Sequence, residues 1–276
     1  MPELPEVETI KRQLEKEVVG ARIKRVEVPT SPTASKGQGN KCWIGDKQLV
    51  VGEKIVEVAR MGKYLFIKFG SGRGLMIHLK MTGRLVLNDL DYDTAPHTRA
   101  VIFLEDGRKI YYWDTRKFGY IRVEDDIESV MNNLREKMGP EPWEISDVEL
   151  LRKLQKTSRS IKETILDQNI LAGVGNIYGN DGLWLAGINP KRIANSLRLA
   201  EVTKLRNSLC NVLERGLATG GASDNTYRDF YGKSGSYQNE FLVYGRTNEP
   251  CRKCGRLLVR IVVGGRGTWV CEKCQK

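Results

Sequence analysis

The chain has 276 residues, of which 40% are hydrophobic and 29% charged, and it contains no apolar run long enough to cross a membrane. This composition excludes a membrane-spanning protein, and the length is sufficient for two domains with separate cores. Lys and Arg number 45 against 34 Asp and Glu, a net charge of +11. That surplus favours a polyanionic partner, with nucleic acid ahead of an acidic membrane, although an inert basic surface is an alternative.

The first twenty residues predict an amphipathic helix that anchors the chain end. Apolar residues recur at three- and four-residue intervals: Leu4, Val7, Ile10, Leu14 and Val18. Pro5 suits the first helical turn and Gly20 suits the stop. If Met1 is removed, Pro2 presents a secondary amine beside the Glu3 carboxyl group, a pair able to attack an aldehyde-level sugar carbon and transfer protons. From these residues alone, the favoured interpretation has no catalytic role: Pro2 is an ordinary proline near the start of the chain, and the acids cap the helix.

Residues 21–123 predict an antiparallel β-sandwich or barrel, because short apolar runs alternate with Gly, Asp and Asn. The expected strands lie around 23–28, 55–58, 64–69, 74–79, 83–87, 99–104, 109–113 and 120–123. Residues 30–40 predict a surface loop, and residues 88–93 a solvated hairpin end.

After Asp125 the apolar period becomes helical, so a domain boundary is expected between Glu124 and Pro142. Ser146 and Glu149 predict a capping box. Further helices are expected over 161–171, 179–185 and 199–217, and a loop over 220–235.

Four of the six cysteines predict a metal site. Cys251, Cys254, Cys271 and Cys274 form two CxxC pairs sixteen residues apart. Two such turns on a hairpin make a tetrahedral thiolate cage for one structural Zn²⁺, which is favoured over disulfides and fits a reducing cytoplasm. Several arginines lie between the outer cysteines, which favours a grip on nucleic acid.

Other candidate residues are weaker signals. The glycines of Gly173–Asn176 permit a turn whose N–H groups bind phosphate at a helix start, although an ordinary interhelical turn is favoured. His78 and His97 have no neighbour at metal spacing; each is equally an ordinary structural residue or a phosphate contact. Phe118 follows Arg116 and Lys117 in a turn, where an aromatic residue is unusual.

Together the motifs closely resemble one family, the bacterial formamidopyrimidine-DNA glycosylases of the formamidopyrimidine/endonuclease VIII group. The resemblance spans nearly the whole chain: PELPEVE from Pro2, GKYL from Gly62, HLKMTG from His78, DTRKFG from Asp114, LDQN and GVGNIY near Asn176, VYGR from Val243, and GRGT from Gly265 within the finger.

The resemblance implies a bifunctional enzyme of base excision repair. It would remove oxidised purines such as 8-oxoguanine and formamidopyrimidines from double-stranded DNA, then cleave the strand at the abasic site by β,δ-elimination. It assigns Pro2 as the nucleophile on C1′ and Glu3 as the acid/base, with Glu6 as a supporting carboxylate. Lys63 matches the lysine associated with β-elimination, and Arg266 the arginine associated with δ-elimination.

The resemblance also implies a set of DNA contacts. Met81, Arg116 and Phe118 match the trio that fills the gap left by a flipped nucleotide, and Asn176 lies in a helix-two-turn-helix phosphate clamp. Further DNA contacts are assigned to His78, His97, Arg159, Lys162, Tyr244 and Arg260. Three residues depart from the family pattern: Lys80 occupies a position where the family commonly has glycine, and Arg260 one where lysine is common. Ser158 stands where a basic DNA contact is often found, with Arg159 adjacent.

The expected fold is α+β. Residues 1–130 form a catalytic antiparallel β-sandwich with an N-terminal helix, 131–220 a helical helix-two-turn-helix domain, 221–246 a lesion-capping loop and connection, and 247–276 a β-hairpin zinc finger. We expect a cytoplasmic bacterial monomer without membrane association. The alternatives are an endonuclease VIII-type glycosylase for oxidised pyrimidines and a catalytically silent binder of damaged DNA.

Overall fold

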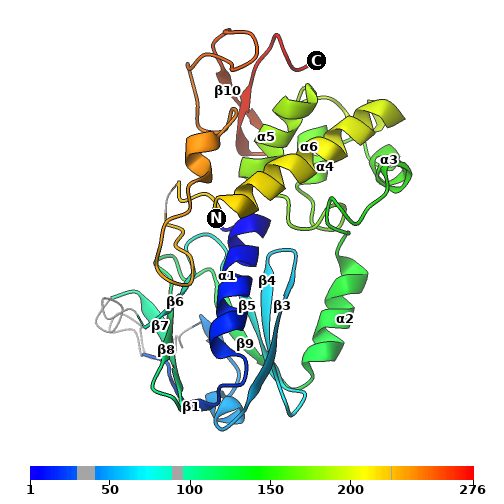
Figure 1. Cartoon of the computed structure of the whole chain (residues 1–276). Helices are drawn as coiled ribbons and strands as arrows, with labels where there is room; N and C mark the ends of the chain where they lie inside the picture. Colours follow the sequence, from blue (N-terminus) through cyan, green and yellow to red (C-terminus); the bar gives the residue numbers. More distant parts are fainter. Residues whose placement is uncertain (30–40, 89–95, 225) are drawn as a thin grey trace. The chain divides into compact units, whose positions relative to one another are not determined.

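The computed structural model describes residues 1–29, 41–88, 96–224 and 226–276, and it divides the chain into two compact units. The N-terminal unit comprises Met1–Leu134 together with Thr219–Ser236, and the C-terminal unit comprises Arg135–Ala218 together with Tyr237–Lys276 (Figure 1). The expectations for residues 30–40 and 89–93 lie outside the described residues. No described helix is long and apolar enough to cross a membrane.

Helix α1 (Leu4–Val18) opens the N-terminal unit and has the amphipathic pattern predicted from sequence. Its five predicted apolar residues are all buried. Pro5 stands in the first turn, and Glu3 is the N-cap of a capping box with Glu6. The chain end is thereby fixed to the unit's core rather than left free.

Two sheets complete the N-terminal unit, as the sandwich prediction required. One has the order β2-β9-β5-β4-β3 and the other the order β1-β7-β8-β6, and every pairing is antiparallel except that of β2 with β9. The strands are β1 (Ile23–Glu27), β2 (Trp43–Ile44), β3 (Ile55–Met61), β4 (Tyr64–Phe69), β5 (Gly74–His78), β6 (Arg84–Leu87), β7 (Thr98–Leu104), β8 (Lys109–Trp113) and β9 (Tyr120–Glu124). A short 3-10 helix, η1 (Lys47–Val50), precedes β3.

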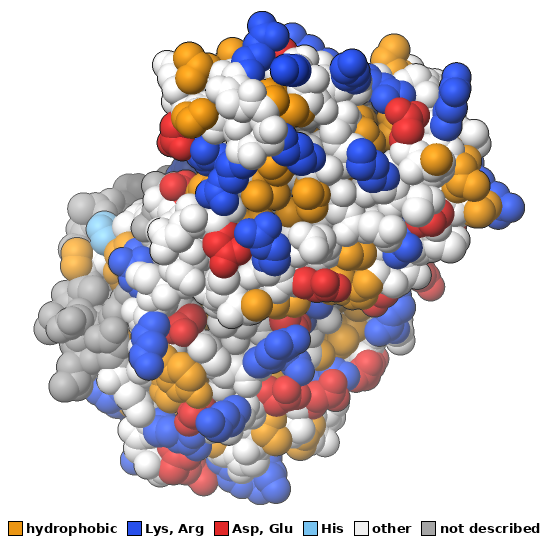
Figure 2. Space-filling model, turned by 45° about the horizontal axis from the view of Figure 1, so that its top comes forward, with side chains coloured by type: hydrophobic (Ala, Val, Ile, Leu, Met, Phe, Trp, Pro, Cys, Tyr) orange, Lys and Arg blue, Asp and Glu red, His pale blue; other side chains and the backbone are white. Residues whose placement is uncertain are grey.

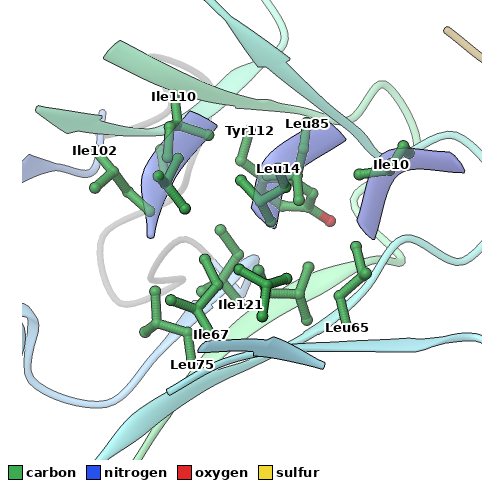
Figure 3. Close-up of a cluster of buried hydrophobic side chains, with 14 of the residues drawn as sticks. Ile10, Leu14, Leu65, Ile67, Leu75, Leu85, Ile102, Ile110, Tyr112 and Ile121 are labelled. Atoms are coloured by element: carbon green, nitrogen blue, oxygen red, sulfur yellow. The ribbon is translucent and has the colours of Figure 1, made fainter. Parts of the chain in front are cut away.

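The main core lies where α1 meets the two sheets. Figure 3 shows Ile10 and Leu14 of the helix directed between residues of one sheet, such as Leu65, and residues of the other, such as Ile110. Tyr227 and Phe230, from the distant segment Thr219–Ser236, belong to the same cluster. Helix α2 (Ile127–Lys137) covers a second cluster on the other face of β4 and β5.

The C-terminal unit is helical and ends in a β-hairpin. It contains α3 (Asp147–Gln155), α4 (Ile161–Ile165), α5 (Asn176–Ala186), η3 (Ala194–Ser196), α6 (Leu199–Ala218), η4 (Tyr237–Glu240), β10 (Val259–Val263) and β11 (Arg266–Val270). Ser146 caps α3 by accepting the Glu149 N–H, which confirms the Ser146 half of the predicted capping box. The helix expected over 161–171 is only five residues long, because the chain turns at Leu166, and α5 begins three residues earlier than expected.

Candidate active site and nucleic-acid interface

The amino terminus is held in place by the Glu6 carboxylate. One oxygen of Glu6 accepts the Glu3 N–H at 2.7 Å, and the other accepts the Ala222 N–H at 2.7 Å. Pro2 is buried, and Glu3 and Glu6 are only 2% and 1% exposed. The carboxylate of Glu6 therefore joins the start of α1 to the segment Thr219–Ser236, and it fixes the backbone that carries Pro2 and Glu3.

The same segment follows α1 along much of its length. The Phe230 N–H donates to Gln13 Oε1 at 2.8 Å, and Gln13 Nε2 donates to Asp229 at 2.8 Å. The Tyr231 hydroxyl donates to Glu17 at 2.9 Å. The segment predicted as a loop is thus docked against α1 by side-chain hydrogen bonds.

Lys63 is at the tip of the hairpin between β3 and β4 and is 7% exposed. An ion pair ties this hairpin to α1: Arg60 Nε lies 2.6 Å from Glu8, and the Arg60 guanidinium also donates to the Gly62 carbonyl at 2.9 Å. Partial burial acts to raise the pKa of Glu8, but hydrogen bonds from Arg60 and Arg12 lower it below its usual value. Glu8 is therefore a stable anion that positions the Lys63 hairpin.

The turns that carry Met81, Arg116 and Phe118 are hydrogen-bonded to each other through Asp114. Asp114 is fully buried; its carboxylate accepts from the Thr82 hydroxyl, from the Arg116 N–H at 3.0 Å and from the Gly119 N–H at 2.9 Å. Phe118 and Met81 are 55% and 40% exposed, and the Arg116 guanidinium lies 4.7 Å from the Phe118 ring centroid. Two exposed apolar side chains and a cation are thereby presented on one rigid pair of turns.

Glycine is required at the end of the second turn. A Cβ on Gly119 would collide with the Tyr112 hydroxyl and approach the carbonyl oxygens of His78 and Leu79 at 2.8 Å. Lys80, in the first turn, has a left-handed φ of 51°, a conformation that favours glycine. The departure noted in the sequence therefore places a strained lysine beside Met81.

His78 is buried next to this turn. It is 8% exposed, its Nδ1 accepts the Lys80 N–H at 3.0 Å, and Tyr64 packs edge-on against its ring. Burial, with the charges of Lys80 and Lys63, lowers its pKa to about 3. His78 is a neutral residue of the site at physiological pH. His97 is partly exposed, packs against Trp113 and lies 3.3 Å from the Arg99 guanidinium.

In the C-terminal unit, Asn176 is the first residue of α5, directly after the Gly175 N-cap. Gln168 supports the preceding turn, because its amide donates to the Val174 carbonyl at 3.0 Å and accepts the Gly173 N–H at 2.9 Å. Asn176 therefore lies at the N-terminal, partially positive end of α5, the end of a helix that favours an anion.

Asn180, one turn later, links the clamp to the β10–β11 hairpin. Its amide donates to the Asn176 carbonyl at 2.6 Å, and its Oδ1 accepts the Trp269 N–H at 3.0 Å. Asn176 itself donates to the Gly267 carbonyl at 3.3 Å. The clamp turn and the hairpin therefore form one hydrogen-bonded structure.

Lys162 is fully buried, contrary to what a surface phosphate contact requires. Its ammonium donates to the Gly267 carbonyl at 3.0 Å and to the Thr268 hydroxyl at 2.6 Å. In this structure Lys162 supports the hairpin that carries Arg266, and a direct contact with DNA remains only a prediction.

The remaining predicted contacts are accessible to different degrees. Arg260 and Arg266 are exposed on the hairpin, and Arg159 is exposed but paired with Asp167 at 2.8 Å. Tyr244 is partly buried against the Trp269 ring, with centroids 4.6 Å apart. Figure 2 shows Lys and Arg side chains over the whole visible face with acidic residues between them, rather than one continuous basic stripe.

The four cysteines form the cluster predicted from their spacing. All four sulfur atoms lie within 4.8 Å of one another, with 3.9 Å between Cys251 and Cys274 and 3.5 Å between Cys254 and Cys271. A tetrahedral site with Zn–S bonds of about 2.3 Å has sulfur–sulfur edges of about 3.8 Å. Burial acts to raise the pKa of Cys251, but the N–H groups of Lys253 and Cys254 lower it to about 6. The cage therefore fits one structural zinc ion.

Several residues that support these sites were not singled out from the sequence. Asp114, Thr82 and Gln168 lie inside recognised motifs, and Asn180 lies one helical turn after Asn176. Asp181 is fully buried and accepts the N–H groups of Leu242, Val243 and Tyr244 and the Tyr237 hydroxyl, so it fixes the segment that leads into the finger. Burial, opposed by these four donors, raises its pKa.

Comparison with known proteins agrees with this geometry over the whole chain. Residues 1–121 match the model of the formamidopyrimidine-DNA glycosylase N-terminal domain, 138–228 that of its H2TH domain, and 248–276 that of a zinc finger found in FPG and IleRS. Proteins named formamidopyrimidine-DNA glycosylase from Desulfitobacterium hafniense and Herpetosiphon aurantiacus are 41% and 38% identical, with all of both chains covered.

Solved structures give the same result. The Lactococcus lactis enzyme in complex with DNA containing an abasic site is 35% identical with a TM-score of 0.87. A MutM structure in complex with DNA containing carbocyclic 8-oxo-G is 35% identical with a TM-score of 0.85; both comparisons cover all of each chain. The buried amino terminus, the paired turns, the clamp and the cysteine cage therefore lie in a chain that belongs to the formamidopyrimidine-DNA glycosylase family.

Proposed function

We propose that this chain is a DNA glycosylase and abasic-site lyase that removes oxidised purines from double-stranded DNA. The observation that carries the proposal is the amino terminus, where Pro2 and Glu3 are fixed by Glu6 at the start of a buried helix. A reactive amine needs such fixed placement, because a nucleophile on a frayed end would rarely meet the sugar in a productive geometry. The relatives named above, which match over their full length, support the same activity.

The proposed reaction starts once Met1 has been removed. The neutral Pro2 amine attacks C1′, the glycosidic bond breaks, and the oxidised base leaves with its bonding electrons and a proton. Glu3 opens the deoxyribose ring by protonating its oxygen. The iminium that forms makes the C2′ proton acidic, so its loss expels the 3′ phosphate, and a second elimination expels the 5′ phosphate. Lys63 and Arg266 are assigned to these two eliminations.

Exposed Met81 and Phe118, with Arg116, are proposed to enter the duplex where the nucleotide is extruded. Extrusion costs a few kcal/mol of unstacking, and an apolar wedge offsets part of it by occupying the vacated stack. The Asp114 hydrogen bonds hold the wedge in advance, so little ordering remains at the moment of binding. Arg116 is proposed to face the orphaned cytosine.

DNA affinity is proposed to come mainly from the clamp and the finger. Asn176, at the start of α5, binds a phosphate, and Arg260 and Arg266 contact the DNA backbone from the hairpin. Arg159, His97 and Tyr244 make further DNA contacts. His78 and Lys162 support neighbouring contacts from buried positions. The zinc ion has no open ligand position and stabilises the hairpin. We further propose that the protein works as a monomer in the bacterial cytoplasm.

The proposed chemistry is tested by trapping. Borohydride reduces an iminium to a stable amine, so the chain should become covalently attached to duplex DNA containing 8-oxoguanine opposite cytosine. Pro2→Gly should reduce trapping strongly, and Glu3→Gln should abolish base excision while DNA binding stays within about threefold. Pro5→Ala is the matched control, because its nitrogen is already part of an amide.

Three outcomes separate the alternatives. Trapping on oxidised pyrimidines in preference to 8-oxoguanine would favour the endonuclease VIII-type enzyme. Failure to trap on either lesion or on a plain abasic site would leave a silent DNA binder. Mass spectrometry that finds Met1 on trapped, active protein would rule out Pro2 as the nucleophile.

A further inference from the structure

The C-terminal end of α5 is docked against the first CxxC turn of the finger. The Lys253 ammonium donates to the Trp184 carbonyl at 3.3 Å and to the Leu185 carbonyl at 3.2 Å. The same ammonium lies 4.3 Å from the Trp184 ring centroid. A lysine at this position satisfies the last carbonyls of a helix, and here its ammonium also holds the Trp184 indole against the first CxxC turn.

The indole N–H of Trp184 needs an acceptor. Trp184 is 3% exposed, and within the described part of the chain its Nε1 makes no hydrogen bond of good geometry. The indole lies close enough to Cys251, two residues before Lys253, to help lower the pKa of that thiol. By contrast, the Trp269 indole in the same finger donates to the Thr247 hydroxyl at 2.7 Å. A buried N–H without an acceptor destabilises the folded chain, and a negatively charged sulfur beside the indole would supply the missing acceptor.

We propose that Trp184 is a positioning residue of the zinc centre, whose indole N–H donates to the thiolate of Cys251 when the metal is bound. A thiol is a weak acceptor, but a metal-bound thiolate carries negative charge and accepts a hydrogen bond well. The N–H groups of Lys253 and Cys254 reach the same sulfur from within the turn. Trp184 adds a donor from outside the finger, on α5.

This bond gives the metal a direct connection to the phosphate clamp. Helix α5 begins at Asn176 and carries Asn180, and these two residues bond to the β10–β11 hairpin. Trp184 lies near the other end of the same helix. The finger therefore contacts α5 at both ends, and the zinc-dependent bond orients the helix that presents Asn176.

The experiment compares Trp184→Phe with the parent chain. Phenylalanine keeps an aromatic ring for Lys253 and removes only the N–H donor. With Co²⁺ in place of zinc, the thiolate-to-metal charge-transfer band of the variant should move to longer wavelength, because the sulfur lone pair loses a hydrogen bond. Zinc transfer to a chromogenic chelator should become about tenfold faster. Trp269→Phe is the matched control, and its charge-transfer band should not move, because that indole is bonded to Thr247.

Faster zinc release with an unchanged charge-transfer band would show that Trp184 acts by packing alone, and this would overturn the proposed hydrogen bond. If neither the band nor the zinc release changed, the proposal would also be overturned. A measurement on the parent chain covers the case in which the variant does not fold. Loaded with a spin-active cadmium isotope, it should show scalar coupling between the metal and the Trp184 indole proton across the N–H···S bond, and a missing coupling contradicts the proposal. None of these readouts depends on DNA chemistry, so they are independent of the proposed function.

Discussion

At the scale of single residues, the site depends on groups whose charge state is set by burial. His78 is the clearest case. It packs against Tyr64 and Tyr120, lies near the ammonium groups of Lys63 and Lys80, and has a pKa of about 3. A neutral His78 adds no charge to the wedge region, so the cationic character of this region comes from its lysines and from Arg116.

The burial of His78 predicts a specific loss of stability in acid. In the unfolded chain the pKa of His78 is close to 6.5. Between about pH 6.5 and pH 3 the unfolded state is therefore protonated at His78 while the folded state remains neutral. Its contribution is therefore complete above pH 6.5 and is lost as the pH falls towards 3, at up to about 1.4 kcal/mol per pH unit. His78→Asn, whose Oδ1 replaces the acceptor for Lys80, should remove this dependence.

Urea unfolding at pH 7 and pH 4.5 provides the measurement. The difference in unfolding free energy between parent and His78→Asn should change by about 2–3 kcal/mol between these pH values. A difference that stays constant would mean that the pKa of His78 is the same in the folded and the unfolded chain.

Lys80 predicts a gain in stability on substitution. Its φ of 51° strains any residue with a Cβ, by about 1 kcal/mol relative to glycine. Lys80→Gly should therefore unfold at a higher urea concentration than Lys80→Ala, which loses the same charge but keeps the strain. Equal midpoints would show that the turn relaxes around the side chain.

At the scale of elements, the sequence predicted most of the sandwich because each strand carries its own alternating or apolar pattern between turn residues. It missed β2, which is two residues long and is stabilised by parallel pairing with β9, far along the chain. It overextended the helix at 161–171, because apolar periodicity continues past the turn held by Gln168. Such features depend on partners distant in sequence, which a local pattern does not contain.

The candidate site shows the same division. The cysteine cage was identifiable from residue type and spacing. Pro2 and Phe118 received their predicted roles only through the family resemblance, and of the residues that support them only Glu6 was named from the sequence. The burial of Lys162 and the hydrogen bonds of Asp114 cannot be predicted from the residues next to them in the sequence, because both depend on the packing of separate turns.

The β10–β11 hairpin offers a matched pair of glycines for testing the interface. Gly264 and Gly265 have φ of 55° and 71°, but only at Gly264 would an added Cβ meet Glu163, with Cδ at 2.9 Å. Gly264→Ala should displace the tip that leads into Arg266 and weaken binding to abasic-site DNA about tenfold, whereas Gly265→Ala should cost only backbone strain. Fluorescence anisotropy, with zinc content checked in both variants, measures the difference; equal affinities would exclude Glu163 as the support of the tip.

At the scale of the whole molecule, the charge of +11 predicts strongly salt-dependent DNA binding. Each phosphate contact contributes about 0.9 to the slope of log affinity against log salt, so Arg260→Ala should reduce that slope by about 1. Arg256→Ala is the comparison, because its guanidinium lies 3.6 Å from Glu272 and is partly neutralised. Titrations at several salt concentrations test this, and an unchanged slope for Arg260→Ala would remove it from the phosphate contacts.

The N-terminal unit is discontinuous in sequence, and this has a consequence for its synthesis. Ala222, Tyr227 and Phe230 belong to the core that holds the first helix, yet they are made more than two hundred residues after it. A ribosome must therefore have translated most of the chain before the amino-terminal helix can complete its packing. An unfinished polypeptide released early would carry Pro2, the proposed nucleophile, without the segment that orders it, and we expect such a fragment to have little activity on DNA.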